Sequence, residues 1–235
     1  MGISEISISA KKIFEVSNFP ITNTFIWALI GGGFIFLLFC FGMKKGKILP
    51  TSLQNFVEWI LENLFNYVDG IVGDRKKTEE IFPLASTLFI FIFLVNLLEI
   101  LPGLGVFPIM RSPSSDLNFT LALALTSMII IHIYAAKRLG FFNHLKKFLN
   151  FKNPLFSFVG ILEGFSELTR TFSLAIRLFG NLFAGGVLLL ITSYLFSLFL
   201  PLPFLFLEIF IGFVQALIFS SLITIFYVCA TQESE

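Results

Sequence analysis

Long uncharged stretches separated by short polar segments dominate the chain. Residues 24–43 carry no charged side chain, and residues 81–101 are interrupted only by Asn96 and Glu99. A third apolar stretch covers residues 119–136. A helix of about 20 apolar residues crosses the ~30 Å hydrocarbon core of a bilayer. The pattern therefore predicts three transmembrane helices.

Residues 51–72 show a different pattern, in which apolar positions recur at helical spacing and polar ones take the other face. Such a segment is typical of an amphipathic helix that lies in the membrane interface. The alternative is a soluble helix packed on another domain, which is less favoured because the chain has no such domain. The apolar face is Leu53, Phe56, Val57, Ile60, Leu64, Val68 and Ile71, and the polar face is Gln54, Glu58, Glu62, Asn66 and Asp69.

The last third of the chain predicts a helical hairpin. After Pro154 no proline occurs up to Leu200, and one helix of that length would reach about 70 Å at ~1.5 Å per residue. A helix over residues 154–200 must therefore tilt strongly, bend or emerge from the membrane. Pro201 and Pro203 are expected to break it, and residues 204–229 form a final apolar helix. The predicted fold class is an all-α integral membrane protein, a single membrane domain over residues 1–235.

Composition and charge agree with this interpretation. Hydrophobic residues make up 56% of the chain and charged residues 13%, whereas soluble domains carry about 25% charged residues. Basic residues concentrate in two loops, which the positive-inside rule places in the cytoplasm, with the N-terminus outside. These residues are Lys44, Lys45, Lys47, Arg75, Lys76 and Lys77 in the first loop, and Lys137, Arg138, Lys146, Lys147 and Lys152 in the second.

Ionisable side chains inside apolar helices are costly and mark functional sites. At about 100° per residue, five polar residues of the 154–200 segment form one stripe under about 100° wide. Such a stripe must face protein or water, and its length favours a path. For Arg170 a structural ion-pair ladder with the neighbouring glutamates is the alternative, but Arg177 has no carboxylate three or four residues away. The stripe comprises Glu163, Glu167, Arg170, Arg177 and Asn181.

Further polar residues lie on the other predicted helices. Glu208 and Gln215 are seven residues apart and share a face, although Gln215 alone could serve as an interhelical hydrogen-bonding group. Asp116 is either a channel residue or a helix N-cap, and His132 is best explained as a packed or hydrogen-bonded histidine. The possible channel-lining residues are Glu167, Arg170, Asp116, Asn118, Glu99 and Asn96.

Several segments resemble the a subunit of F-type ATP synthases. Residues 173–185, SLAIRLFGNLFAG, are similar to the signature of that family, and Glu208 with residues 215–219 resembles its last helix. Residues 116–125 resemble its third-span segment, and residues 20–24 and 52–55 resemble bacterial members. The resemblance covers nearly the whole chain.

The resemblance implies a mechanism. Arg177 would face a carboxylate on each subunit of a rotating c ring, hold it ionised and block a direct leak between two offset half-channels. Proton flow would then couple to rotation. Asn181 and Glu163 match cytoplasmic half-channel positions, Glu208 matches an outer half-channel position, and Gln215 matches a glutamine near the arginine.

The resemblance also implies partners and a location. The partners would be the c ring, the peripheral stalk b subunit, the rest of the ATP synthase and the lipid bilayer, and no nucleic acid. The location would be a bacterial plasma (inner) membrane. Many bacterial members carry an acidic residue where this chain has Gly186, so Glu208, either alone or together with Asp116, is expected to supply the outer-channel carboxylate. Glu99 stands at a position where the family commonly has a small residue, and a role for Glu99 in lining the entry channel is a hypothesis.

Other function classes fit less well. An unrelated multi-pass transporter is disfavoured because the chain shows no internal repeat and no paired Gly/Pro interruption. An intramembrane hydrolase lacks support because there is no HExxH motif and no Ser/His pairing at suggestive spacing. ATP binding is not expected because there is no Gly-rich phosphate loop followed by Lys-Ser or Lys-Thr. No catalytic site, metal or cofactor is therefore expected, and Cys40 and Cys229 predict neither a zinc site nor a disulfide. Sodium in place of protons stays open.

Overall fold

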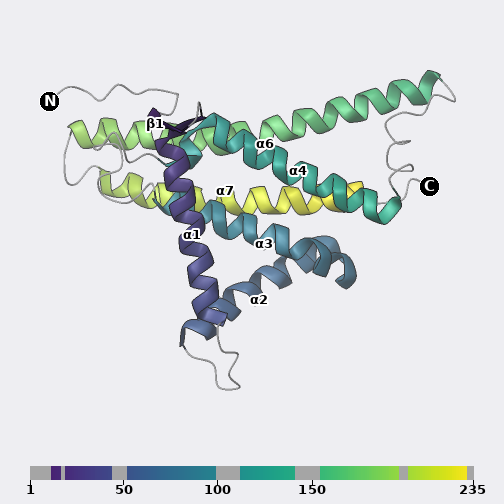
Figure 1. Cartoon of the computed structure of the whole chain (residues 1–235), viewed down its shortest axis with the longest axis horizontal. Helices are drawn as coiled ribbons and strands as arrows, with labels where there is room; N and C mark the ends of the chain where they lie inside the picture. The colour runs from purple at the N-terminus through teal and green to yellow at the C-terminus, as the bar shows by residue number, and fades with distance from the viewer. Residues whose placement is uncertain are drawn as a thin grey trace.

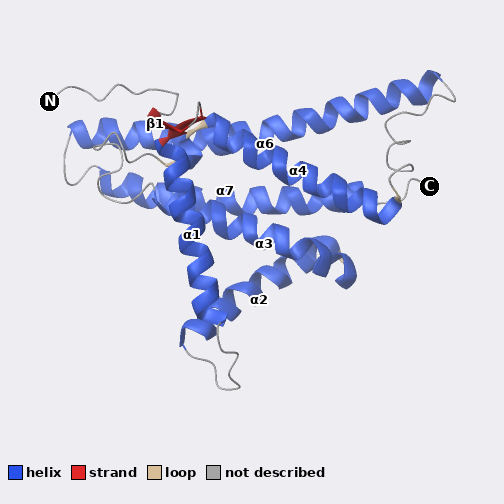
Figure 2. Cartoon of the chain, viewed as in Figure 1, coloured by secondary structure: helices blue, strands red, loops and turns tan. Residues whose placement is uncertain are grey.

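The computed structural model describes residues 12–16, 19–43, 52–98, 112–140, 154–195 and 201–231. These ranges contain six α-helices, a short 3-10 turn and one antiparallel pair of strands (Figures 1 and 2). The helices are α1 (Asn23–Met43), α2 (Ser52–Val72), α3 (Arg75–Leu98), α4 (Leu117–Leu139), α6 (Pro154–Leu195) and α7 (Pro201–Ala230). The turn is η1 (Pro113–Ser115), and the strands are β1 (Lys12–Val16) and β2 (Phe19–Thr22).

Five of these helices, all except α2, are long and apolar enough to cross a membrane. The predicted fold class, a helical integral membrane protein, is confirmed at this level. The β1–β2 pair was not predicted. Its strands have five and four residues, which is too short for an alternating pattern to stand out.

The directions of the helices divide them into two groups. Helices α3, α4, α6 and α7 lie along the long axis of the molecule, whereas α1 crosses them steeply (Figure 1). Helices that cross steeply cannot both be perpendicular to one bilayer. The axes of α3 and α4 are therefore aligned with those of α6 and α7. The sequence pattern had instead grouped residues 81–101 and 119–136 with residues 24–43, as three transmembrane helices of one kind.

The four aligned helices alternate in direction, so each end of the bundle collects particular segments (Figure 1). One end, here called the basic end, holds the start of α3 and the end of α4. Its basic residues include Arg75, Lys76, Lys77, Lys137 and Arg138. The opposite end, here called the η1 end, holds η1, the start of α4 and the start of α7.

Two expected helix boundaries need correction. The last helix begins at Pro201 and contains Pro203, although both prolines were expected to precede it. Proline is tolerated in the first turn because the backbone N–H groups there have no intrahelical acceptor. Helix α3 begins at Arg75, earlier than the expected residue 81. The apolar pattern missed this start because the first turn of the helix is charged rather than apolar. Glu99 and residues 196–200 lie outside the described residues.

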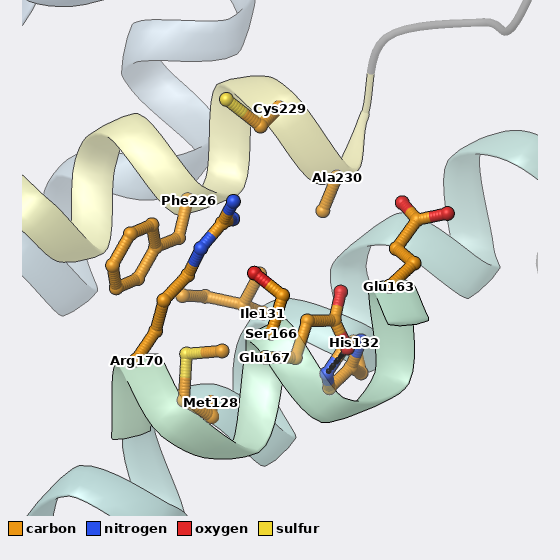
Figure 3. Close-up of a pocket in the computed structure, with 10 residues that line it drawn as sticks. All are labelled: Met128, Ile131, His132, Glu163, Ser166, Glu167, Arg170, Phe226, Cys229 and Ala230. Atoms are coloured by element: carbon orange, nitrogen blue, oxygen red, sulfur yellow. Dashed lines mark ion pairs between the residues drawn. The ribbon is translucent and has the colours of Figure 1, made fainter. Parts of the chain in front are cut away.

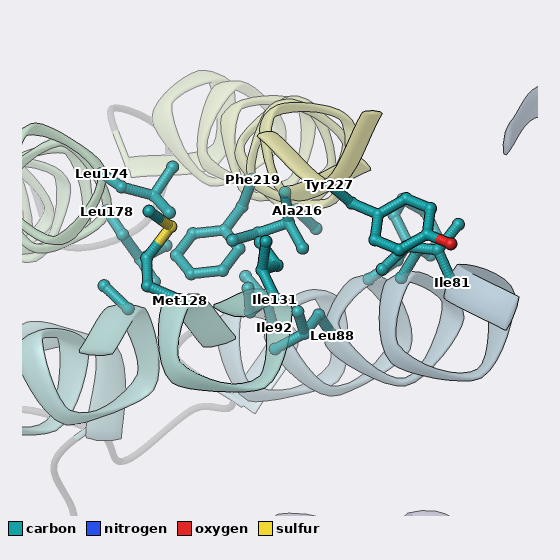
Figure 4. Packing of buried hydrophobic residues seen from close by; sticks show 14 of the residues in the cluster. Ile81, Leu88, Ile92, Met128, Ile131, Leu174, Leu178, Ala216, Phe219 and Tyr227 are labelled. Atoms are coloured by element: carbon teal, nitrogen blue, oxygen red, sulfur yellow. The ribbon is translucent and has the colours of Figure 1, made fainter. Parts of the chain in front are cut away.

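The core forms where α3, α4, α6 and α7 meet (Figure 4). Helix α6 contributes buried side chains at helical spacing, and α7 approaches α3 closely through small residues. A Cβ atom added to Gly212 would lie 3.1 Å from Cβ of Asn96, and Ser220 Oγ donates to the Ala85 carbonyl at 2.8 Å. The labelled core residues are Ile81, Leu88, Ile92, Met128, Ile131, Leu174, Leu178, Ala216, Phe219 and Tyr227.

A polar clamp joins three helices at the basic end. The Tyr227 hydroxyl donates to Glu80 Oε2 at 2.7 Å, and Arg138 Nη1 lies 3.3 Å from the same oxygen. Arg138 Nη1 also donates to the Tyr227 hydroxyl oxygen at 3.2 Å. Because these residues come from α7, α3 and α4, the clamp fixes the spacing of the three helices.

Candidate functional site

Arg177 lies on α6 at the edge of the face that packs against α4 and α7. Its neighbours Leu174 and Leu178 are buried, whereas Arg177 itself is exposed. Within the described ranges, Arg177 takes part in no ion pair and no side-chain hydrogen bond. Its charge therefore points out of the bundle.

The outward face of α6 beside Arg177 is apolar. Leu188, Ile191 and Leu195 are 38%, 47% and 62% exposed, and at about 100° per residue they point within about 40° of Arg177. The predicted polar stripe follows the border between this face and the buried face, whereas Phe165 and Phe172 lie on the opposite side of the helix. A surface of this kind suits lipid or another apolar helix.

The register between α6 and α7 follows from two contacts. Gly185 lies against Glu208, and Glu163 shares a pocket with Ala230. Both pairs give the same antiparallel register, which puts Arg177 level with Ala216, next to the buried Gln215. The expected proximity of Gln215 and Arg177 along the hairpin therefore agrees with this register.

Glu208 is buried near the start of α7, with a relative exposure of 6%. Neither of its carboxylate oxygens has a hydrogen-bond partner in the part of the chain that the structure describes. A Cβ atom at position 185 would lie 2.7 Å from Glu208 Oε1, so the glycine leaves room for the carboxyl group. A buried carboxyl group without a partner is costly and is a candidate for proton binding.

We expect Gly185→Ala to destabilise the protein by about 0.5–1.5 kcal/mol relative to its control, because the new methyl group would push the Glu208 side chain out of its rotamer. Thermal unfolding of the purified protein in detergent would measure this effect. Gly33→Ala is the matched control, because no atom lies within 4 Å of a Cβ atom there. Equal unfolding temperatures of the two variants would contradict the close contact.

A hydrogen-bonded polar cluster lies at the η1 end, one helical turn from Glu208. Asn96 Nδ2 donates to the Gly212 carbonyl at 3.2 Å, and Ser114 Oγ donates to Asn96 Oδ1 at 2.9 Å. Close to this cluster, Thr24 Oγ1 of α1 donates to Asp116 Oδ2 at 3.0 Å. The second oxygen, Asp116 Oδ1, accepts from the Asn118 amide at 3.0 Å. The N-cap interpretation of Asp116 is confirmed, while the Asn118 side chain is exposed.

A second polar site, here called the inner pocket, lies toward the basic end between α4, α6 and α7 (Figure 3). His132 Nε2 lies 3.2 Å from Glu167 Oε2, and Arg170 stacks over the Phe226 ring at 5.5 Å from its centroid. The pocket has a volume of about 50 Å³ and is also lined by Glu163, Ser166 and Cys229.

The inner pocket alters two expectations about the polar stripe. Glu167 pairs with His132 across helices, and no ion pair of the described residues includes Arg170, so the local ladder is not formed. The hydrogen-bonded interpretation of His132 is confirmed. Its place beside Glu167 could not be found from the sequence, because 35 positions separate the two residues. Among the described residues no group of three or more His, Cys, Asp or Glu could hold a metal ion.

Asn181 and Glu163 lie on opposite sides of Arg177 along α6. They are 18 residues apart, which is about 27 Å in a helix. Asn181 is exposed and one turn from Arg177, toward Glu208, whereas Glu163 lines the inner pocket. The resemblance assigned both to the cytoplasmic half-channel, which would then extend along this length of α6.

Comparison with known proteins decides the family. A family model described as ATP synthase A chain matches residues 24–228. The chain belongs to this family. It is 31% identical over 219 residues to ATP synthase subunit a 2 of a Bradyrhizobium species, covering 93% of each chain. It is 32% identical over 221 residues to ATP synthase subunit a of Moorella thermoacetica, covering 92% of this chain and 94% of the relative.

A third relative, ATP synthase subunit a of Gloeobacter violaceus, is 35% identical over 185 residues, which cover 77% of this chain and 72% of the relative. The resemblance seen in the sequence is thereby confirmed. With five apolar helices of spanning length, this member of the ATP synthase A chain family is a multi-pass membrane protein.

Proposed function

We propose that this chain is the proton-translocating subunit a of an F-type ATP synthase in a bacterial plasma membrane. The observation that carries the proposal is the position of two polar sites on either side of Arg177. Gly185, which contacts Glu208, is eight residues from Arg177, and Glu167 is ten residues away in the other direction. These separations correspond to about 12 Å and 15 Å of helix.

The two polar sites serve as offset half-channels. Glu208 carries protons in the outer half-channel, which is reached from the η1 end past Asn96, Asp116 and Asn118. Glu163, with Glu167 and Arg170, lines the inner half-channel, which opens at the basic end. Glu99 stays a candidate for the outer path. Since the polar sites do not meet, a proton cannot pass from one to the other through this chain alone.

Arg177 couples the two half-channels through the c ring. The apolar outward face of α6 packs against the ring, and the exposed guanidinium faces one ring carboxylate at a time. An opposite charge stabilises an ionised carboxylate in a low-dielectric setting. Along the axis of the α6–α7 hairpin, Gln215 and Asn181 lie within one helical turn of Arg177. They are available to hydrogen-bond the exchanging carboxyl groups.

The orientation follows from charge. The basic end faces the cytoplasm because short cytoplasmic loops are enriched in Lys and Arg, and the η1 end faces outward. Helix α2 lies in the cytoplasmic interface, where its exposed Phe56 and Trp59 contact lipid headgroups. The peripheral stalk b subunit is the second proposed partner.

The test is ATP-driven proton uptake by inverted membrane vesicles that contain the complete complex. Vesicles from cells that lack this chain are the control. We expect luminal acidification only when the chain is present, without added sodium. Equal acidification in both preparations would overturn the proposal. A strict requirement for sodium, with sodium uptake in place of proton uptake, would reassign the coupling ion and leave the coupling role intact.

A further inference from the structure

The inner pocket contains an acid–base pair that the coupling role of Arg177 does not use. We propose that His132 and Glu167 form a proton-collecting relay that loads the inner half-channel from the cytoplasmic side, with Glu163 as its neighbour. The inference rests on the proposed function, because it assigns a step to the inner half-channel.

Geometry supports a direct hydrogen bond between the two side chains. The 3.2 Å separation of His132 Nε2 and Glu167 Oε2 is within hydrogen-bonding distance. The side chains are 33% and 22% exposed, so neither is sealed in the core. They come from α4 and α6, and Figure 3 shows them facing the same space as Glu163 and Arg170.

The inner pocket has room for water. Its volume of about 50 Å³ exceeds the ~15 Å³ that one water molecule needs by this measure. Carboxylate, imidazole, guanidinium and hydroxyl groups line it, which supply the two to four polar partners that a buried water requires. Water in the pocket would connect the pair to the basic end.

The groups that face His132 come from two packed helices. Helix α6 presents Glu163, Glu167 and Arg170, and α7 presents the thiol of Cys229. Arg170 is stacked over Phe226. The histidine thus faces the Glu167 carboxylate and shares the pocket with a second acidic group, one guanidinium and one thiol, a setting in which an imidazolium has a counter-ion.

The relay step is a proton transfer. A hydronium ion in the inner pocket gives its proton to Nδ1 of the neutral imidazole and becomes water, while the Glu167 carboxylate, which accepts from Nε2–H, stabilises the imidazolium. The imidazolium then returns the proton to a pocket water on the Arg177 side. Imidazole is the side chain that changes charge between about pH 5 and 8. The relay should raise the rate of proton uptake most at alkaline pH, where hydronium is scarce.

The experiment measures initial rates of ATP-driven proton uptake in inverted vesicles, whose cytoplasmic face meets the medium, from about pH 6.5 to about pH 8.5. His132→Gln and Glu167→Gln each keep a hydrogen-bonding group but remove proton exchange. We expect rates within about twofold of wild type at the acidic limit and a loss of about tenfold at the alkaline limit, below the 10²–10⁴ ascribed to a positioned acid–base group. The double variant should resemble either single variant, because the pair acts as a unit.

Glu80→Gln is the matched control. It removes a carboxylate that also bridges helices at the basic end but lies outside the inner pocket. Its rate relative to wild type should not change with pH. A purely structural role of His132 and Glu167 would give the same pH-independent factor, measured per assembled complex, and would overturn the relay.

Cys229 offers a second readout. It lines the inner pocket, whereas Cys40, the other cysteine of the chain, lies on α1. Silver ions in the medium should inhibit wild type and Cys40→Ser more strongly than Cys229→Ser. Equal inhibition of all three would show that the pocket is closed to the medium and would overturn the water path.

Failure of the relay is distinguishable from failure of the proposed function. Arg177→Ala should be inactive at every pH. If Arg177→Ala pumps protons, the coupling mechanism is wrong. If Arg177→Ala is inactive while both relay variants keep the wild-type pH profile, only the relay is wrong.

Discussion

Replacing Arg177 with alanine is expected to reduce ATP-driven proton pumping by about 100-fold or more without preventing assembly. A charged side chain at the centre of a membrane helix costs about 2.5–3.5 kcal/mol. Without the guanidinium, a ring carboxylate that faces α6 would bear that cost, and each 1.4 kcal/mol is tenfold. Assembly should survive because Arg177 is exposed and its side chain has no partner in the described ranges.

The measurement is fluorescence quenching of a pH-sensitive dye in inverted vesicles, normalised to the amount of assembled complex. Arg75→Ala is the control, since Arg75 is a solvent-facing arginine at the basic end with 66% side-chain exposure. Arg75→Ala should pump at the wild-type rate. Normal pumping by Arg177→Ala would show that its charge is only structural.

The second large effect concerns Glu208, whose replacement by glutamine should reduce pumping at least tenfold. Glutamine has nearly the same shape but cannot release or bind a proton, and positioned acid–base groups contribute roughly 10²–10⁴-fold to proton transfer. The described chain offers no hydrogen-bond partner to the carboxylate oxygens, so the amide loses no structural contact there. The loss should appear in proton uptake, with little change in the amount of complex.

Glu208→Asp separates proton binding from shape. Aspartate keeps the acid but shortens the side chain beside Gly185, so we expect it to pump faster than Glu208→Gln. The opposite order would mean that side-chain length, and not proton exchange, matters at position 208. Both variants and the wild type should be measured side by side in the same series of vesicle preparations.

Much of the fold follows from one-dimensional patterns. Apolar stretches of spanning length identify α1, α3 and α4, and helical spacing identifies the segment that forms α2. The stripe from Glu163 to Asn181 could be predicted because all its members lie on a single helix. Likewise, the N-cap at Asp116 is a local feature, formed with Asn118 two residues away.

Contacts between helices could not be predicted in the same way. The pairing of His132 with Glu167 depends on how α4 and α6 are shifted along each other, which periodicity within each helix leaves free. The same holds for Gly185 and Glu208, where the sequence directed attention to the neighbouring Gly186. The steep crossing of α1 over α3 brings Gly31 beside Val95, where an added Cβ would lie 3.4 Å from Cγ2, a contact between helices that the pattern within either helix does not predict.

The apolar outward face of α6 has a consequence for friction. Contacts between hydrocarbon groups are non-directional and weak, about 0.1–0.2 kcal/mol per atom pair, so a surface sliding past the exposed Leu188, Ile191 and Leu195 breaks no hydrogen bonds. Its energy changes little with displacement along this face. In the proposed coupling role, the guanidinium of Arg177 is then the main periodic obstacle, and one electrostatic contact sets the timing of each rotary step.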